Sequence, residues 1–166
     1  MTVLLPSASV CGLSTDRDQP INIEADTAEL DDEKAMTVYR GNVIVIQGSI
    51  RMTGDEMTIY YTPENELDVV IMDGKPATYR QLPDDSQVYD EAEALHMEYH
   101  GKDNLIILTD KAIVKQEGLQ FSGKRIEYDT VRSRIKARGD TGTDQTDTVN
   151  GADDGRVRIT IQPRKK

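Results

Sequence analysis

A near-match to a phosphate-binding loop is the first pattern in the chain that could perform chemistry, and it spans residues 118–125. Its glycines and Lys124 have the spacing with which backbone amides surround a phosphate before a helix begins. Arg125, however, stands where a magnesium-binding serine or threonine belongs, and the segment is strand-like, with no convincing helix after it. Gly54 occupies the equivalent turn of an internal repeat, so a repeated β-turn explains the match. The sequence therefore predicts no nucleotide site.

The two histidines of the chain, His96 and His100, flank Glu98. Strand alternation puts all three side chains on one face, with the nitrogen and oxygen ligands that zinc accepts. Residues two apart on a strand are separated by roughly 7 Å, so three in a row converge poorly on one ion. The three also alternate with apolar neighbours, as expected of a solvent-facing side. We predict neither a metal site nor a cofactor.

Catalytic residues are also not predicted. A nucleophilic triad would need one of the two histidines, and no Gly-x-Ser-x-Gly elbow occurs. Carboxylates are plentiful but are expected in turns and on polar faces, and residues 140–154 lack the ordered Asp-x-Asp-x-Asp-Gly spacing of a calcium loop. A carbohydrate-active enzyme with paired carboxylates is an alternative, but aromatic residues that would stack against sugars are scarce.

Strands must position these residues, because period-two alternation dominates after residue 20. Ile21 and Ile23 alternate with polar residues, as do Ile50 and Met52. Three short runs, 43–46, 69–72 and 105–108, are apolar on both faces and predict the most covered strands. Turn residues recur about every seven to ten positions, including Gly41-Asn42, Gly54-Asp55, Asp73-Gly74 and Gly123. This pattern predicts an all-β fold: a meander, sandwich or jelly roll.

An internal repeat relates the two halves of the chain at an offset of 69 residues. The residues of the first copy are Val45, Gln47, Ile50, Met52, Gly54, Met57 and Ile59, and those of the second are Val114, Gln116, Leu119, Phe121, Gly123, Ile126 and Tyr128. After a shortening of four residues, Val70, Met72 and Gly74 correspond to Ile135, Ala137 and Gly139. One copy cannot bury its own apolar face, whereas two copies can enclose a shared interior.

Composition limits the possible partners. The chain has 20 basic and 30 acidic residues, a net charge of −10, so its surface repels phosphate backbones and we predict no nucleic-acid binding. The charge is uneven: residues 16–34 hold eight acidic and two basic residues, and residues 156–166 hold five basic ones. With one phenylalanine and no tryptophan, the core must be mostly aliphatic and methionine. Such a lining suits either a thin sandwich core or a surface that accepts acyl chains.

The predicted organisation is a single domain at residues 16–162, with a flexible loop at about 140–155 and a basic tail at 163–166. Residues 1–15 are expected to be a signal-peptide remnant or a disordered leader, which suggests secretion. Cys11 is the only cysteine, so an intramolecular disulfide is excluded, and the residues before it do not fit a lipidation site.

Three motifs resemble those of a known family. They are residues 18–26 (Asp-Gln-Pro-Ile-Asn-Ile-Glu-Ala-Asp), 41–48 (Gly-Asn-Val-Ile-Val-Ile-Gln-Gly) and 74–78 (Gly-Lys-Pro-Ala-Thr). In this order, and together with the repeat, they resemble the OstA-like family of periplasmic lipopolysaccharide-transport bridge proteins. The resemblance covers about residues 16–139 and resumes at 156–163.

The resemblance implies an antiparallel β-jelly roll, twisted and open at both ends, that holds lipid acyl chains between its inner faces. It implies a non-enzymatic carrier that takes lipopolysaccharide from the inner to the outer membrane. Family members stack head to tail between an inner-membrane LptC-like protein and the amino-terminal domain of an outer-membrane LptD-like translocon. Matching the motifs gives Ile21, Tyr79, Met97 and Tyr99 as lipid-contacting residues. The apolar sides of the alternating strands add Ile23, Met52 and Phe121.

Sheet edges are the expected joints between molecules, because terminal strands expose unpaired backbone groups. We predict that one edge carries Ile21, Ile23 and Ala25 and that the other carries Val157, Ile159 and Ile161, helped by the opposite charges of the two ends. A structural or adhesive β-repeat module, in which the same apolar faces form a closed dry core, is the alternative that the sequence leaves open.

Overall fold

The structure is a computed structural model that describes residues 15–64, 66–129, 132, 134–140 and 155–162. Its elements are a 3₁₀ turn η1 (Asp16–Asp18) and ten strands: β1 (Asn22–Glu24), β2 (Thr27–Asp31), β3 (Met36–Gln47), β4 (Ile50–Tyr61), β5 (Leu67–Gln81), β6 (Asp90–His100), β7 (Leu105–Gln116), β8 (Leu119–Asp129), β9 (Arg134–Arg138) and β10 (Arg158–Ile161). The predicted leader (1–14), basic tail (163–166) and most of the predicted loop (141–154) lie outside the described residues. Across the described ranges, no helix is long and apolar enough to cross a membrane.

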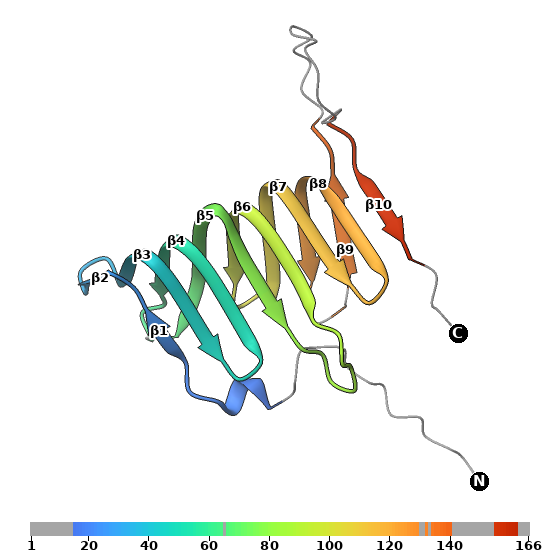
Figure 1. Ribbon diagram of the computed structural model, residues 1–166. Coiled ribbons are helices and arrows are strands. Elements are labelled where there is room, and N and C mark those ends of the chain that lie inside the picture. The colour runs from blue at the N-terminus through green and yellow to red at the C-terminus, as the bar shows by residue number, and fades with distance from the viewer. Residues whose placement is uncertain (1–14, 65, 130–131, 133, 141–154, 163–166) are drawn as a thin grey trace, which may run out of the picture.

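All ten strands belong to one antiparallel sheet. The strand order is β1-β3-β4-β5-β6-β7-β8-β10, with β2 paired to β3 and β9 paired to β8. The sheet does not close, because β1 and β10 lie at opposite ends of this order (Figure 1). The prediction of an all-β, antiparallel and open fold is therefore confirmed.

The six long strands, β3 to β8, each bend near the middle and so pass through two layers (Figure 1). Strand β3 pairs with β2 through residues 36–40 and with β1 through residues 44–46. At the other end, β8 pairs with β10 through residues 119–122 and with β9 through residues 125–129. We call the layer that contains β1 and β10 the front layer, the layer that contains β2 and β9 the back layer, and the line of bends the spine.

The bends lie at shifts of strand register. One shift falls between Arg40 and Val43, where Gly41 and Asn42 both have positive φ angles of 82° and 47°. Residues 110 and 111, at the same position in the second copy, have φ angles of 63° and 54°. The prediction of turns at Gly41-Asn42, Gly54-Asp55, Asp73-Gly74 and Gly123 is therefore wrong, since these residues lie inside strands. A sharp bulge needs the same backbone freedom as a turn, so both use the same residue types.

The buried core lies along the spine. The back layer contributes Met57, Met72, Met97, Leu108 and Ile126, and the front layer contributes Val43, Ala77, Ala94 and Ala112. Large side chains thus face small ones, and the layers approach so closely that a Cβ atom on Gly54 would lie 2.5 Å from the sulfur of Met72. Such packing leaves no room for a ligand at the spine.

The repeat is visible in the strand register. Met57 pairs with Met72 as Ile126 pairs with Ala137, and the next pairs along, Ile59–Val70 and Tyr128–Ile135, correspond in the same way. The near-match to a phosphate loop falls mostly on β8, where Gly123 lies inside the strand opposite the register shift of β7, so the repeated element is a bend and not the predicted turn.

The three apolar runs are covered mainly on one side. Their outward residues Val69, Ile71 and Leu105 are half-buried, Ile46 is exposed, and only Ile107 is fully buried. Two layers suffice to cover one face of each strand, while neighbouring side chains within the sheet shield the other.

Candidate functional site

The space between the two layers is the candidate site, and its lining changes with distance from the spine. Beyond the buried spine row, a middle row in each layer is apolar. The front middle row is Val45, Met52, Tyr79, Ala92, Val114 and Phe121. The back middle row is Ile59, Val70, Tyr99, Ile106, Tyr128 and Ile135. Most of these residues are half-buried, so they are neither solvent-facing nor fully enclosed.

A small cavity of about 20 Å³ lies within this space. The front layer lines it with Tyr79, Ala92 and Val114, and the back layer with Ile106, Leu108 and Tyr128. This volume holds about one water molecule. The cavity thus lies between the packed spine and the mouth of the front layer, and its own volume does not hold an acyl chain.

The predicted lipid-contacting residues fall in three settings. Met52, Tyr79, Tyr99 and Phe121 are half-buried in the middle rows. Ile23 pairs with Val45, and so extends the front middle row to the sheet edge. Met97 is only 2% exposed and belongs to the spine row, whereas Ile21 is 55% exposed and precedes β1. The structure thus brings five of the seven residues to the middle rows or their extension.

Sequence reasoning missed part of the lining. Eight further residues lie in the middle rows: Val45, Ala92, Val114, Ile59, Val70, Ile106, Tyr128 and Ile135. The repeat pairs Val45 with Val114, Ile59 with Tyr128 and Val70 with Ile135, so the reasoning that linked Met52 with Phe121 could have added these six.

A partly polar row, which we call the lip, lies at the mouth of the front layer two residues beyond the middle row. It comprises Gln47, Ile50, Gln81, Asp90, Gln116 and Leu119. The Gln116 side-chain amide donates a hydrogen bond to Asp90 at 3.2 Å, and the Tyr79 hydroxyl donates to the side-chain carbonyl of Gln81. Burial raises the pKa of the Asp90 carboxyl above its ordinary value, although the bond from Gln116 opposes this shift.

The N-terminal edge strand β1 is fixed at both ends by aspartates. Asp16 is 1% exposed and accepts hydrogen bonds from the backbone N–H and the hydroxyl of Ser49, both at 2.7 Å. Asp26 accepts a bond from Asn42 at 2.9 Å, and its own N–H donates to the carbonyl of Gly41. Gly41 leaves room for the Asp26 carboxylate, and Gly48 leaves room for the Asp16 carboxylate. A Cβ atom on either glycine would overlap that aspartate.

The edges at the two ends of the sheet differ in character. In β10, Ile159 and Ile161 are 56% and 71% exposed, while Val157 before it is half-buried. In β9, the residues exposed on the outer side are basic: Arg134, Lys136 and Arg138. In β2, Glu29 and Asp31 lie on the outer side, where Glu29 pairs with Arg40 at 3.4 Å and Asp31 pairs with Lys34 at 2.6 Å. The outward side chains of β2 itself are thus acidic where those of β9 are basic.

The two histidines lie on the outer side of the back layer, which confirms that they face away from the interior. His96 Nδ1 is 2.6 Å from Asp73, its Nε2 is 3.0 Å from Glu98, and His100 Nε2 is 2.9 Å from Glu98. Partial burial of His96 opposes its charging, but the hydrogen bonds that its ring donates to the Asp73 and Glu98 carboxylates outweigh burial and raise its pKa. Among the described residues, no group of three possible ligands has an arrangement that could hold a metal ion.

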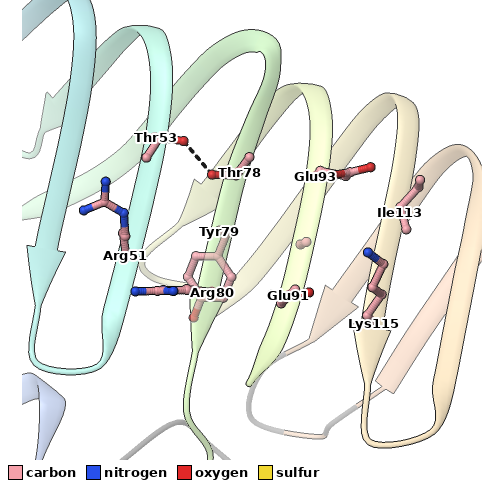
Figure 2. A pocket seen from close by; sticks show the side chains of 10 residues that line it. Arg51, Thr53, Thr78, Tyr79, Arg80, Glu91, Glu93, Ile113 and Lys115 are labelled. Carbon is pink, nitrogen blue, oxygen red and sulfur yellow. Dashed lines mark hydrogen bonds between the residues drawn. The ribbon is translucent and has the colours of Figure 1, made fainter. Parts of the chain in front are cut away.

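A second hollow, of about 380 Å³, lies on the outer side of the front layer (Figure 2). Arg51, Arg80, Glu91 and Lys115 form one row across it, and Thr53 and Thr78 form the next. Figure 2 shows the Arg51 and Arg80 side chains on the same side of the sheet. Tyr79 and Ala92 of the middle row also border this hollow, but most of its lining is charged or polar, so it is not the apolar site.

A folded antiparallel sheet with open edges and an apolar interior defines a class of open, two-layered β-protein. The family model described as "LptA/(LptD N-terminal domain) LPS transport protein" matches residues 22–134. The chain belongs to this family.

Relatives of known name agree with the assignment. The chain is 39% identical over its whole length to the lipopolysaccharide export system protein LptH of Pseudomonas aeruginosa, of which it covers 92%. It is 33% identical to LptA of Escherichia coli K12 over 83% of the chain and 73% of the relative. The crystal structure of LptH, described as a periplasmic component of a conserved lipopolysaccharide transport device, superposes with a TM-score of 0.75 at 40% identity. That match covers 90% of this chain and 99% of LptH.

Proposed function

We propose that the protein is a non-enzymatic periplasmic carrier that holds the acyl chains of lipopolysaccharide between its two layers and passes the lipid from the inner towards the outer membrane. One observation carries the proposal. The front middle row forms an apolar path in register from Ile23 in β1 to Ile159 in β10, across every strand between them.

The chemistry of the middle rows suits transient binding. Burial of each methylene group of an acyl chain contributes roughly 0.8 kcal/mol, so partial enclosure of several chains can hold a lipid without ionic contacts. The middle rows carry no charged side chain, and the surface with a net charge of −10 repels phosphate. Release is possible because burial of acyl chains is non-directional, and a partner supplies the energy for transport.

A non-enzymatic role is supported by the relatives, which are named as export system proteins. The interior rows also lack a pair of groups suited to acid–base chemistry. Asp90 is the one carboxyl in the lip row, and its hydrogen-bond partner is an amide.

Head-to-tail assembly follows from the directions of the strands. Each strand of the front layer is antiparallel to the next, from β1 to β10, so β1 and β10 run in opposite directions. A second copy placed end to end would thus pair β10 of one molecule with β1 of the next in the antiparallel sense. The predicted edge residues Ile21, Ile23 and Ala25 would then meet Val157, Ile159 and Ile161.

The back layer would join in the same way. Strand β2 is antiparallel to β3 and β9 is antiparallel to β8, so β2 and β9 also run in opposite directions. Their outward residues have opposite charges: Glu29 and Asp31 in β2, and Arg134 and Lys136 in β9. The same edges can accept an inner-membrane LptC-like protein and the amino-terminal domain of an outer-membrane LptD-like translocon, since the matched family includes that domain.

A structural β-repeat module with a closed dry core is the second candidate. The buried spine row and the small cavity of about 20 Å³ favour it. It differs from the carrier in one respect: its middle rows would never contact lipid.

Photo-crosslinking separates the two candidates. A photoreactive residue at Tyr79 faces the interior, whereas one at Thr78, the preceding residue of β5, faces the outer hollow. We expect crosslinks to lipopolysaccharide from position 79 and none from position 78. Crosslinks to protein alone at position 79 would favour the dry core, and equal lipid labelling at both positions would show nonspecific contact.

A further inference from the structure

The lip of the front layer carries a polar strip whose role the apolar interior does not explain. Gln81, Asp90 and Gln116 lie on the neighbouring strands β5, β6 and β7. The bond from Gln116 to Asp90 and the bond from Tyr79 to Gln81 hold these side chains in place, and the Gln81 amide also donates to Asp16 at 3.4 Å. Asp90 and Gln116 also line the small interior cavity, beside the apolar residues of the middle row.

Solvation alone does not account for this strip. In the same row, the flanking strands β4 and β8 carry the apolar residues Ile50 and Leu119. Leu119 is 37% exposed, so exposure at this row does not by itself require a polar residue. Polar residues therefore occupy the centre of the mouth while apolar ones flank it. In β3, at the N-terminal end of the row, Gln47 binds the backbone carbonyl of Gln19 at 3.2 Å, which is a structural contact.

The chemistry of the strip favours neutral hydrogen-bonding groups over phosphate. Glutamine amides both donate and accept, and a carboxyl group accepts when ionised and donates when protonated. The strip contains no cation, and Asp90 would repel a phosphate. Hydroxyl and amide groups of a ligand match the strip, because they donate and accept hydrogen bonds and carry no negative charge.

The position of the strip fixes which part of a lipid it meets. Each strip residue is two positions from a middle-row residue of its own strand, a spacing of roughly 7 Å. An acyl chain that entered between the layers at this mouth would cross the strip with its first few atoms. In lipopolysaccharide these atoms include amide links to the sugar and hydroxyl groups close to them, whereas the chains of a diacyl phospholipid begin at esters.

We infer that Asp90 and Gln116, with Gln81 beside them, form a subsite that binds the amide and hydroxyl groups at the base of the acyl chains, and so selects lipopolysaccharide over phospholipid. This inference rests on the proposed function, because it needs lipid between the layers.

The test measures selectivity rather than binding. A photoreactive residue at Tyr99, in the back middle row, is exposed to mixed micelles that contain equal amounts of lipid A and phosphatidylglycerol, and mass spectrometry gives the ratio of the two lipids captured. The variants are Gln116→Leu and Asp90→Leu. Gln120→Leu is the matched control, because it lies on the adjacent strand β8 in register with outward-facing Lys115.

We expect the ratio of captured lipid A to phosphatidylglycerol to fall about five-fold in each lip variant, as loss of one hydrogen bond of about 1 kcal/mol requires. The control should keep the wild-type ratio. Since the two substitutions lie on different strands, a folded variant remains if one of them fails to fold. An unchanged ratio in a folded lip variant would overturn the subsite, whereas absence of lipid capture by the parent protein would overturn the proposed function itself.

Discussion

Replacement of Asp16 by alanine should detach the edge strand β1 without unfolding the rest of the sheet. The Asp16 carboxylate is 1% exposed and accepts two hydrogen bonds of 2.7 Å from Ser49. A longer bond of 3.4 Å comes from Gln81. Strand β1 itself has three residues and pairs only with β3, and its other end is held by Asp26 through Asn42 and Gly41.

The magnitude follows from these bonds. Hydrogen bonds to charged groups contribute about 1.5–3 kcal/mol each, and donors left without partners in a buried site add to the loss. Because the two bonds share one acceptor group, we expect a combined loss of about 2–4 kcal/mol in the local stability of residues 15–24. A loss of this size raises the population of the detached state by a factor of roughly 30 to 900.

Hydrogen exchange measures this detachment residue by residue. Backbone amides of β1 and of its β3 partners, residues 44–46, should exchange faster by about that factor in Asp16→Ala. Amides at the centre of β6 should be unchanged. Asp18→Ala is the matched control, because Asp18 lies in the same turn but is exposed. Unchanged protection of β1, or an equal loss of protection in β6, would refute this account of the edge.

Three further predictions concern the spine, the outer face and the bends. Met97→Ala, at a side chain 2% exposed, should lower the free energy of unfolding by about 2–5 kcal/mol in urea titrations, and Met52→Ala, in the half-buried middle row, should cost clearly less. Because the pKa of His96 is raised, its hydrogen bonds stabilise the fold fully below the unfolded pKa of about 6.5, and this contribution is lost as the pH rises through the folded value. The melting temperature of the wild type minus that of His96→Asn should therefore fall between pH 6 and pH 8.5, and a constant difference would contradict the pairing with Asp73 and Glu98. Gly41→Ala should lower stability by about 1–2 kcal/mol, because φ is positive and the new Cβ would displace Asp26. Asp110→Ala, at the same bend of the second copy, should lower stability by less than half as much, because Asp110 already has a Cβ atom at positive φ. Equal losses of stability for the two variants in thermal unfolding would contradict this explanation.

The sequence was sufficient to predict the all-β fold, but it placed turns where β3, β4, β5 and β8 bend and did not identify β2. Period-two alternation identified the inward side of several strands, and the repeat paired Met52 with Phe121 before their shared row was visible. Side chains of alternating strands have only two directions, so the pattern determines which residues share a face.

Depth within the interior could not be predicted. Met97 and Tyr99 are two residues apart on the same face, yet Met97 lies at the packed spine and Tyr99 in the half-buried middle row. That distinction depends on where each strand bends, and bends and turns use the same glycine chemistry. The roles of Asp16 and β9 were also hidden, because they depend on contacts between distant segments.

Lipid contact in the middle rows is the central claim, and the methionine methyl groups test it most directly. Met52 lies in the front middle row, Met57 and Met72 lie at the packed spine, and Met36 lies on the outer side in register with Tyr60. With methyl-labelled methionines in an otherwise deuterated protein, nuclear Overhauser effects to the acyl chains of bound lipopolysaccharide should appear at Met52 and be absent at Met36 and Met72. Absence of the effect at Met52 while lipid is bound, or its appearance at Met36 alone, would contradict the account.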